Sequence, residues 1–395
     1  MLLDNVLLLN DSRPVSLSVS DGKITGTAVR NVTKKKDGFN IHFLDALAIP
    51  GLINSHDHLD FNCFTPLGNR KYKSYTDWGN HIQKAYKENI DAVLCIPQPL
   101  RARWGMYKNL LSGITTVVNH GKVLKIENPV ITIYQEPQSL HSVKFQKKWK
   151  WKLNNPFLQN KTCVIHTGEG VDEQSYDEIQ ELLKYNFLKR KLVGVHGVAM
   201  SPAQAEKFRG LVWCPESNRV LLDKHADIAA LKGNTCLVLG TDSTLTGNWN
   251  VWQHLRLART LQKVEDAELF SMITSHPAKL WGLNTGELLP GKDADIVIVK
   301  NKRGHADWDD LFAVNPEDVL MVVHKGEIRL FDQTLLSQIS SKLVDLNRFN
   351  PVSVNGVIKF AEGNLPALIA SIRKYNPHIV FPLGNSIICK HSGDD

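Results

Sequence analysis

Two histidines spaced two residues apart, His56 and His58, follow an apolar run from Leu47 to Ile53. A short apolar run of this kind is typical of a buried strand, and side chains at positions i and i+2 leave a strand on the same side. The two imidazoles therefore point toward one place. Neutral histidine is the commonest nitrogen ligand of zinc and similar ions, so the pair is a candidate half of a metal site. Histidine pairs also occur in polar loops without a metal, so further ligands are needed before these two histidines can be assigned to a metal site.

Other strand-like runs also end in residues with metal-binding or acid-base chemistry. His166, His196 and Asp242 each stand at the end of such a run. A single histidine at a strand end is more often structural than functional, but several such residues at one rim indicate one site. Glu169, three residues after His166, adds a carboxylate that is placed to exchange protons. These residues meet only if their strands are parallel neighbours, because the carboxyl ends of such strands share one edge.

Strand-like and helix-like segments alternate between residues 49 and 285. Strands that alternate with helices pair in parallel through right-handed crossovers. Seven strands are clear in this region, and an eighth is placed near Val143 to Leu153. The number of strands favours a closed (β/α)8 barrel of the TIM type. An open sheet would normally carry a Gly-rich phosphate loop after its first strand, and no such loop is present. The span from Tyr134 to Thr162 is short for two complete units, so one strand or helix of the barrel is expected to be reduced.

Both ends of the chain have the pattern of short antiparallel strands. Residues 1–48 alternate apolar and polar positions around turn residues such as Asp21-Gly22, which is typical of hairpins. Residues 286–332 return to this pattern after a turn-rich segment. We therefore expect a small β-sandwich domain built from both chain ends. The predicted limits are 1–48 with 286–332 for the sandwich, 49–285 for the barrel, and 333–395 for a helical extension in which 335–346 and 365–375 are helix-like.

The composition fits a globular protein with an ample core, since 43% of the 395 residues are hydrophobic. The first residues lack a basic leader and no later run is long enough to span a bilayer, so we expect a cytoplasmic protein without a membrane partner. Six scattered cysteines favour neither a disulfide framework nor a thiolate metal site. Part of the formal charge of +7 lies in Lys34–Lys36 and in Lys144–Lys152. No nucleic-acid-binding module surrounds them, so we expect solvated surface segments and no nucleic-acid partner.

Seven short motifs occur in the order in which one enzyme superfamily carries them. They are Pro50-Gly51-Leu52-Ile53-Asn54-Ser55-His56-Asp57-His58, Gly113-Ile114-Thr115-Thr116-Val117-Val118, His166 with Glu169, His196-Gly197, Cys214-Pro215-Glu216-Ser217-Asn218, Gly240-Thr241-Asp242-Ser243, and Leu289-Pro290-Gly291-Lys292-Asp293-Ala294-Asp295. In these motifs the chain resembles the metal-dependent amidohydrolase superfamily, in the branch of the cytosine, adenosine, guanine and S-adenosylhomocysteine deaminases and the triazine hydrolases. The resemblance implies an enzyme with a small-molecule substrate, most simply one that deaminates a heterocycle or an amidine-like group.

The resemblance also implies how the strand-end residues are used. By position, the ligands of one divalent ion, zinc or alternatively iron, would be His56, His58, His166 and Asp242. Such an ion lowers the pKa of a water molecule enough to supply hydroxide near neutral pH. Asp242 would take the proton from this water, and His196 would orient the hydroxide. Glu169 would protonate the ring nitrogen beside the attacked carbon and help ammonia to leave.

Some alternatives stay open at this stage. Relatives with two metal ions use a lysine at the fourth strand, but the nearest candidate, Lys144, has the basic surroundings of a surface residue, so one ion is favoured. Glu136 is either a turn residue or a metal ligand, and the second choice would make the protein an amide hydrolase or deacetylase. His120 either contacts substrate or is merely buried. A further alternative is a catalytically silent relative that acts as a binding protein.

Aromatic and polar residues near the predicted rim are harder to assign. Trp78, Trp104 and Trp213 either stack on a heterocycle or pack in the core, which is the usual place for tryptophan. Ser217 and Asn218 lie just beyond the seventh strand and are candidate rim residues.

Overall fold

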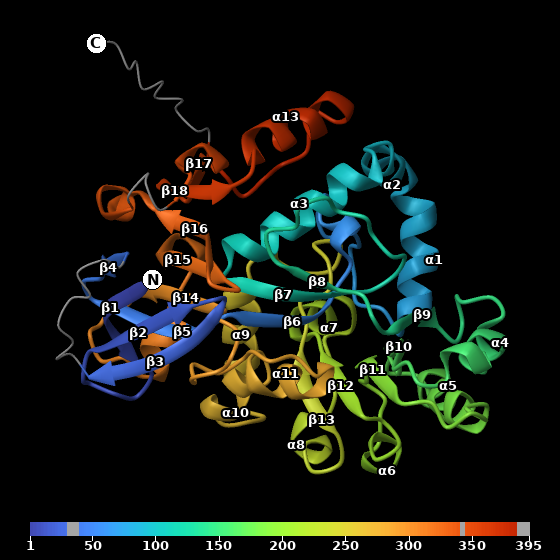
Figure 1. The fold of residues 1–395 in the computed structure, drawn as a ribbon. Helices are drawn as coiled ribbons and strands as arrows, with labels where there is room; N and C mark the ends of the chain where they lie inside the picture. Colours follow the sequence, from blue (N-terminus) through green and yellow to red (C-terminus); the bar gives the residue numbers. More distant parts are fainter. Residues whose placement is uncertain (30–38, 340–343, 385–395) are drawn as a thin grey trace.

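Eight parallel strands form the centre of the described part of the chain. The computed structural model describes residues 1–29, 39–339 and 344–384 (Figure 1). The strands pair as a group of three, in the order β6-β7-β8, and a group of five, in the order β13-β12-β11-β10-β9. Every ladder in both groups is parallel. Their bounds are β6 (Leu52–Asp57), β7 (Ile114–Asn119), β8 (Thr132–Tyr134), β9 (Gln138–Ser142), β10 (Cys163–Thr167), β11 (Leu192–His196), β12 (Gly210–Trp213) and β13 (Cys236–Leu239).

The two groups of strands meet at the carboxyl ends of β6, the first parallel strand in the chain, and β13, the last. The backbone amides of Thr241 and Asp242, just after β13, donate to the carbonyl oxygen of His56 in β6 at 3.1 and 3.0 Å. At the other junction, residues 135–137 alone connect β8 to β9, so this unit has no helix, as the short span predicted. The parallel α/β arrangement agrees with a TIM-type fold, whereas a closed ring of eight strands is not confirmed.

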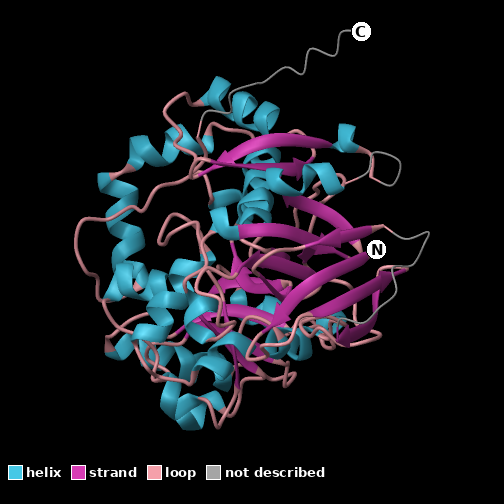
Figure 2. Ribbon diagram, turned by 90° about the vertical axis from the view of Figure 1, so that its left-hand side faces the viewer, coloured by secondary structure: helices cyan, strands magenta, loops and turns pink. Residues whose placement is uncertain are grey.

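Six of the strands, all but β8 and β9, are buried on both faces, which is why they appear as nearly continuous apolar runs. Apolar side chains from six of them form one buried cluster: Ile53, Val118, Val164, Val195, Val212 and Val238. Helices cover the other face of the strands (Figure 2). They are α1 (Tyr75–Ala85), α2 (Lys87–Leu94), α3 (Gln98–Leu111), α4 (Trp149–Leu153), α5 (Glu173–Lys184), α6 (Pro202–Ala205), α7 (Pro215–Leu222), α8 (Ile228–Leu231), α9 (Val251–Thr260), α10 (Asp266–Ser271), α11 (Ser275–Trp281) and, before the late strands, α12 (Trp308–Phe312).

The eighth strand was predicted in the wrong place. It is β9, which ends at Ser142, and the predicted stretch from Val143 to Leu153 contains helix α4 instead. The alternation of lysine and tryptophan there imitates a strand with one apolar face. Trp149 and Leu153, four residues apart, are buried together, whereas Trp151 is 82% exposed. Burial of Trp149 and Leu153, at positions i and i+4, together with exposure of Trp151, fits a helix and not a strand.

Strands from both ends of the chain form a second sheet, of ten strands within the described residues. Its order is β17-β18-β16-β15-β14-β5-β1-β2-β3, with β4 paired to β1. The antiparallel ladder between β5 and β14 joins the two chain ends. Because hydrogen bonds link all these strands into one sheet, the predicted β-sandwich is not confirmed. The bounds are β1 (Leu2–Leu8), β2 (Val15–Ser20), β3 (Lys23–Val29), β4 (Asn40–His42), β5 (Ala46–Pro50), β14 (Ile296–Lys300), β15 (Val319–His324), β16 (Glu327–Asp332), β17 (Phe349–Val354) and β18 (Val357–Glu362).

The segment after residue 333 differs from the predicted pair of helices. Among its described residues, 333–339 and 344–384, α13 (Leu365–Tyr375) is the one α-helix. The stretch predicted as helix from Leu335 holds the 3-10 helix Gln333–Gln338, with residues 340–343 outside the described part. Strands β17 and β18 form a hairpin around Asn355-Gly356, whose φ angles of 47° and 83° match the turn that this dipeptide favours. Pro351 is tolerated because β17 lies at the sheet edge.

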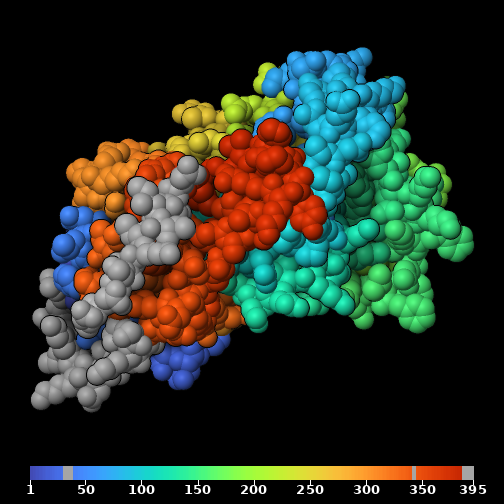
Figure 3. All heavy atoms as spheres, turned by 90° about the horizontal axis from the view of Figure 1, so that it is seen from above, coloured from blue at the N-terminus to red at the C-terminus, as the bar shows by residue number. Residues whose placement is uncertain are grey.

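The hairpin and α13 lie against the helices that precede β7 (Figure 3). The hydroxyl of Tyr107 in α3 donates to the carbonyl oxygen of Glu362 at 2.8 Å, and the rings of Trp104 and Phe381 are 4.8 Å apart. Lys34–Lys36 lie outside the described residues. Among the described residues, no helix has the length and the apolar character needed to cross a membrane.

Candidate metal centre

Three histidine side chains from two strands converge at the carboxyl end of the parallel strands. The Nε2 atom of His166, at the end of β10, lies 3.2 Å from Nε2 of His56 and 3.4 Å from Nε2 of His58. All three candidate ligand atoms lie within 4.8 Å of one another. His166 donates from Nδ1 to the carbonyl oxygen of His141 at 2.7 Å, which leaves the lone pair of Nε2 facing the cluster. A backbone partner of this kind is what fixes the tautomer of a metal-binding histidine.

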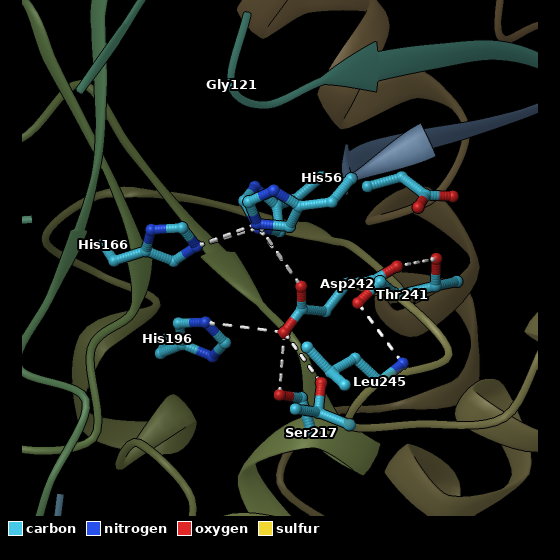
Figure 4. A network of polar contacts seen from close by, with 12 residues as sticks. His56, Gly121, His166, His196, Ser217, Thr241, Asp242 and Leu245 are labelled. Atoms are coloured by element: carbon cyan, nitrogen blue, oxygen red, sulfur yellow. Dashed lines mark hydrogen bonds and ion pairs between the residues drawn. The ribbon is translucent and has the colours of Figure 1, made fainter. Parts of the chain in front are cut away.

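Asp242 faces the same place with one carboxylate oxygen. Its Oδ1 lies 3.7 Å from Nε2 of His56 and 3.6 Å from Nε2 of His58. Its Oδ2 accepts hydrogen bonds from the hydroxyls of Ser217 at 2.9 Å and Thr246 at 3.0 Å (Figure 4). Asp242 has a φ of 56°, a left-handed conformation that is costly for this residue type. The two hydroxyls and the β6 carbonyl therefore hold the carboxylate in a fixed direction.

His196 and Glu169 border this group. Nε2 of His196 lies 3.5 Å from Oε1 of Glu169 and 3.9 Å from Oδ2 of Asp242. His196 donates from Nδ1 to Oδ1 of Asn218 at 2.8 Å, so in the neutral ring the lone pair of Nε2 faces the two carboxyl groups. His196, like Asp242, has a positive φ, at 70°. Two residues with positive φ at the ends of β11 and β13 are typical of a functional site.

Burial lowers the pKa values of three histidines of the site. It lowers the pKa of His58 to about 4, with a further contribution from His56, and it lowers the pKa of His196 to about 4. The pKa of His166 falls well below its ordinary value for the same reason, burial first and neighbouring histidines second. A metal ion needs unprotonated nitrogen donors, so these rings are in the binding form at neutral pH.

The two carboxyl groups have pKa values shifted in opposite directions. Burial, followed by the charges of Asp242 and Glu178, raises the pKa of Glu169 well above its ordinary value. Burial also acts to raise the pKa of Asp242, but the hydrogen bond with His56 and the electrostatic interactions with the surrounding histidines outweigh it and hold the pKa well below the ordinary value. A carboxyl group with a raised pKa and one with a lowered pKa therefore both lie within 4 Å of Nε2 of His196.

A buried polar network behind β6 orients the first two histidines, and sequence reasoning missed it. Asp57 points away from the cluster, between His56 and His58, and forms an ion pair with Lys108 of α3 at 2.9 Å. Asn62 and Asn109 each donate to the same carboxylate at 2.8 Å. The pair is almost fully buried, with 1% of the Lys108 side chain and none of the Asp57 side chain exposed. The only sequence signal was a lysine within the apolar face of a helix.

The other sequence candidates are placed as follows. The side chain of Glu136 is 76% exposed and lies 4.0 Å from Lys161, so it does not join the cluster. Ser217 and Asn218 hold Asp242 and His196 rather than forming an outer rim. His120 lies inside the group of rings and is treated below. The three tryptophans and Lys144 are not part of the cluster: Trp104 and Trp213 are buried core residues, Trp78 donates to the carbonyl oxygen of Leu67, and Lys144 is exposed.

The donor set fits a divalent metal ion of the zinc type. Three imidazole nitrogens and one carboxylate oxygen from four different positions approach one point. The second nitrogen of His166 is held by a backbone carbonyl, and the second oxygen of Asp242 is held by two hydroxyl groups. Zinc binds such nitrogen and oxygen donors and keeps a position open in catalytic sites.

Comparisons with known proteins agree with this chemistry. The model of the amidohydrolase family matches residues 157–329. A 5-methylthioadenosine/S-adenosylhomocysteine deaminase of Pyrococcus furiosus is 26% identical over 76% of this chain and 87% of the relative. One of Syntrophus aciditrophicus is 24% identical over 74% of this chain and 81% of the relative.

Solved structures with the same fold carry zinc. An adenosine deaminase from Xanthomonas campestris with bound zinc covers 96% of this chain and 98% of its own, with a TM-score of 0.71 and 16% identity. The atrazine chlorohydrolase of Arthrobacter aurescens complexed with zinc covers 94% of this chain and 99% of its own, with a TM-score of 0.66 and 16% identity. The similarity to amidohydrolases predicted from the motifs is confirmed, and with it an enzyme that hydrolyses carbon–nitrogen bonds.

Proposed function

We propose that this chain, an amidohydrolase-like enzyme of non-peptide carbon–nitrogen bonds, removes the amino group of a nitrogen heterocycle, and that 6-aminopurine nucleosides are the substrates to test first. The observation that carries the proposal is the pair of buried carboxyl groups with opposite pKa shifts, Glu169 and Asp242, beside the cluster of three histidines. Deamination of an aromatic ring needs both an acid for the ring nitrogen and a base for the attacking water. The relatives named for adenosine-type substrates support the choice of purine nucleosides.

We assign the metal ligands to His56, His58, His166 and Asp242, and we propose one ion, zinc, with iron as the alternative. When bound, the ion supplies a water molecule of lowered pKa as the nucleophile. The convergence of the three Nε2 atoms and the direction of Oδ1 of Asp242 support this assignment.

The protein's own groups divide the proton transfers between them. Asp242 is ionised and can accept the proton of the attacking water, while Ser217 and Thr246 keep its carboxylate in position. His196, held by Asn218 through Nδ1, orients the water with Nε2. Glu169, whose pKa is raised by burial, can donate a proton to the ring nitrogen beside the attacked carbon. The proton held by Asp242 then passes to the amino group, and the carbon–nitrogen bond breaks to release ammonia. The proton of the added hydroxyl returns to Glu169 as the carbonyl forms.

We propose that the eight parallel strands form a TIM-type barrel with one reduced unit at β8 and β9, and that the β13 to β6 junction completes it. The predicted limits are a small domain of residues 1–48 and 286–332, a barrel of residues 49–285 and a C-terminal extension of residues 333–395.

The experiment is a screen for ammonia release. Purified, zinc-loaded protein is incubated with adenosine, 5′-substituted adenosines, guanine, cytosine and their nucleosides, and ammonia is measured with a coupled dehydrogenase. We expect turnover with at least one 6-aminopurine nucleoside, its loss after chelation and its return with zinc. Release of a carboxylic acid from N-acylated substrates without ammonia would instead favour an amide hydrolase, which the exposure of Glu136 already disfavours in its metal-ligand form. Less than about half an equivalent of bound metal in protein purified without added metal would favour a silent relative.

A further inference from the structure

His120 lies at the carboxyl end of β7, on the side of the strand that faces the interior of the parallel strands. Val118, two residues earlier, belongs to the buried cluster that also contains Val164 and Val212. Side chains alternate along a strand, so His120 leaves the backbone on the same side as Val118 and one layer closer to the metal ligands. Val164 and His166 repeat this relation on β10.

The His120 ring is packed among the predicted ligands. Its centroid lies 4.9 Å from that of His56, 5.2 Å from that of His58 and 4.5 Å from that of His166. The residue is 3% exposed. Its ligand atoms are not part of the group in which three histidine nitrogens lie within 4.8 Å of one another. His120 therefore borders the reaction position without belonging to the ligand set.

Neither ring nitrogen of His120 has a hydrogen-bond partner among the described residues. His166 is held through Nδ1 by a backbone carbonyl and His196 by an asparagine. His56 lacks a partner at Nδ1 alone, since its Nε2 lies 3.2 Å from Nε2 of His166, whereas both nitrogens of His120 lack one. A buried polar group without a partner is costly, and proteins retain one where a ligand will supply the missing bond.

We propose that His120 contacts the substrate, with one ring nitrogen forming a hydrogen bond to a polar atom of the heterocycle whose amino group is removed. The inference rests on the proposed function and extends it, because it names a residue that forms a hydrogen bond with the ring that loses its amino group. The packing against three ligand rings supports a contact near the attacked carbon rather than with a distant substituent. A neutral imidazole has one N–H donor and one acceptor nitrogen, so it can recognise either a ring nitrogen or an amino group.

The test uses binding rather than turnover. In a background of Glu169→Gln, the zinc-loaded protein is titrated with adenosine by calorimetry, with and without His120→Phe, which fills a similar volume but has no polar atom. We expect full zinc content in both proteins and an adenosine dissociation constant raised at least tenfold by His120→Phe. His120→Gln, which keeps a donor and an acceptor, should recover part of the loss.

Analogues of adenosine that lack single polar groups locate the contact. The same titrations are made with purine riboside and with 1-deaza-, 3-deaza- and 7-deazaadenosine. The analogue that lacks the contacted atom should bind the protein with His120 and the His120→Phe protein equally well. If His120→Phe weakens all of them by the same factor, its effect is only on the shape of the site and the proposal is wrong.

Two other outcomes are also decisive. Loss of zinc from the His120→Phe protein would make His120 a metal ligand and overturn the inference. An unchanged dissociation constant for adenosine in His120→Phe, while the protein with Glu169 intact releases ammonia from adenosine, would overturn it and leave the proposed function standing. Failure of zinc-loaded protein both to bind and to deaminate every nucleoside would remove both proposals together.

Discussion

Replacement of Lys108 by methionine should weaken metal binding from a position outside the ligand set. Lys108 and Asp57 form a buried ion pair at 2.9 Å, and Nζ of Lys108 also donates to Oδ1 of Asn62 at 3.1 Å. Asp57 lies between His56 and His58, so the direction of its side chain fixes theirs. Methionine has similar length but no charge, and it leaves the Asp57 carboxylate buried without its counter-ion. Removal of one partner of such a pair costs roughly 3–5 kcal/mol of stability.

A second buried ion pair provides the matched control. In the terminal sheet, Nζ of Lys359 lies 2.6 Å from Asp332 and also donates to the carbonyl oxygens of Glu317 and Val319, each at 2.8 Å. This pair is as deeply buried as the first, with side-chain exposures of 0% and 2%. Lys359→Met should therefore destabilise the fold by a similar amount, but it does not touch the strand that carries the histidines.

The assay measures stability and metal affinity separately. Urea unfolding in the presence of a chelator gives the stability of the metal-free proteins, and competition with a chromophoric chelator gives the zinc dissociation constant. Both variants should lose stability, but only Lys108→Met should raise the zinc dissociation constant, by about 10- to 100-fold, as is usual for residues that orient ligands. A further change of Asp57 to Asn should restore part of the stability, because no charge is then left unpaired. Equal zinc affinity in the two lysine variants would refute the reasoning.

The remaining predictions concern the ligands and the acids of the site. Glu169→Gln should keep its zinc while kcat falls by about 10²- to 10⁴-fold, the usual contribution of a general acid. As a control, Glu173→Gln, at an exposed position nearby, should leave kcat unaltered. Full turnover in Glu169→Gln would remove Glu169 from the mechanism. His166→Ala should retain less than about half an equivalent of zinc after dialysis, measured by elemental analysis, because one of three nitrogen donors is lost; a full equivalent would contradict the ligand assignment. Glu178 accepts a hydrogen bond from the amide of Gly168, and burial raises its pKa to about 7 from an ordinary value of 4.5. Between these pH values the folded protein holds a proton that the unfolded chain has released, so stability falls as the pH rises through this window. Relative to the unmodified protein, Glu178→Gln should therefore gain on the order of 3 kcal/mol of unfolding free energy between pH 4 and pH 8, and a constant difference across this range in urea unfolding would contradict the assigned pKa.

Much of the site followed from local spacing in the sequence. The two-residue spacing of His56 and His58 set the side of the strand that they share, because the strand period of two is a property of the backbone itself. The apolar runs before His166, His196 and Asp242 predicted strand ends, and the alternation with helices predicted a common rim. These predictions needed only the order of residues along the chain, and the structure brings all five side chains to one place.

Other features depend on contacts between residues far apart in the chain, and only the tertiary structure decided them. Lys108 and Asp57 are joined by the packing of α3 against β6, and no local pattern distinguishes a buried lysine from an exposed one. The lysine and tryptophan alternation near Trp149 fits a strand or a helix, and burial of Trp149 with Leu153 chose the helix. The missing hydrogen-bond partners of His120 exist only as a property of the folded site. Short-range geometry along the chain thus shows which residues can do chemistry. Long-range packing decides which neighbours shift their pKa values, which neighbours orient them, and which of their polar atoms have no partner.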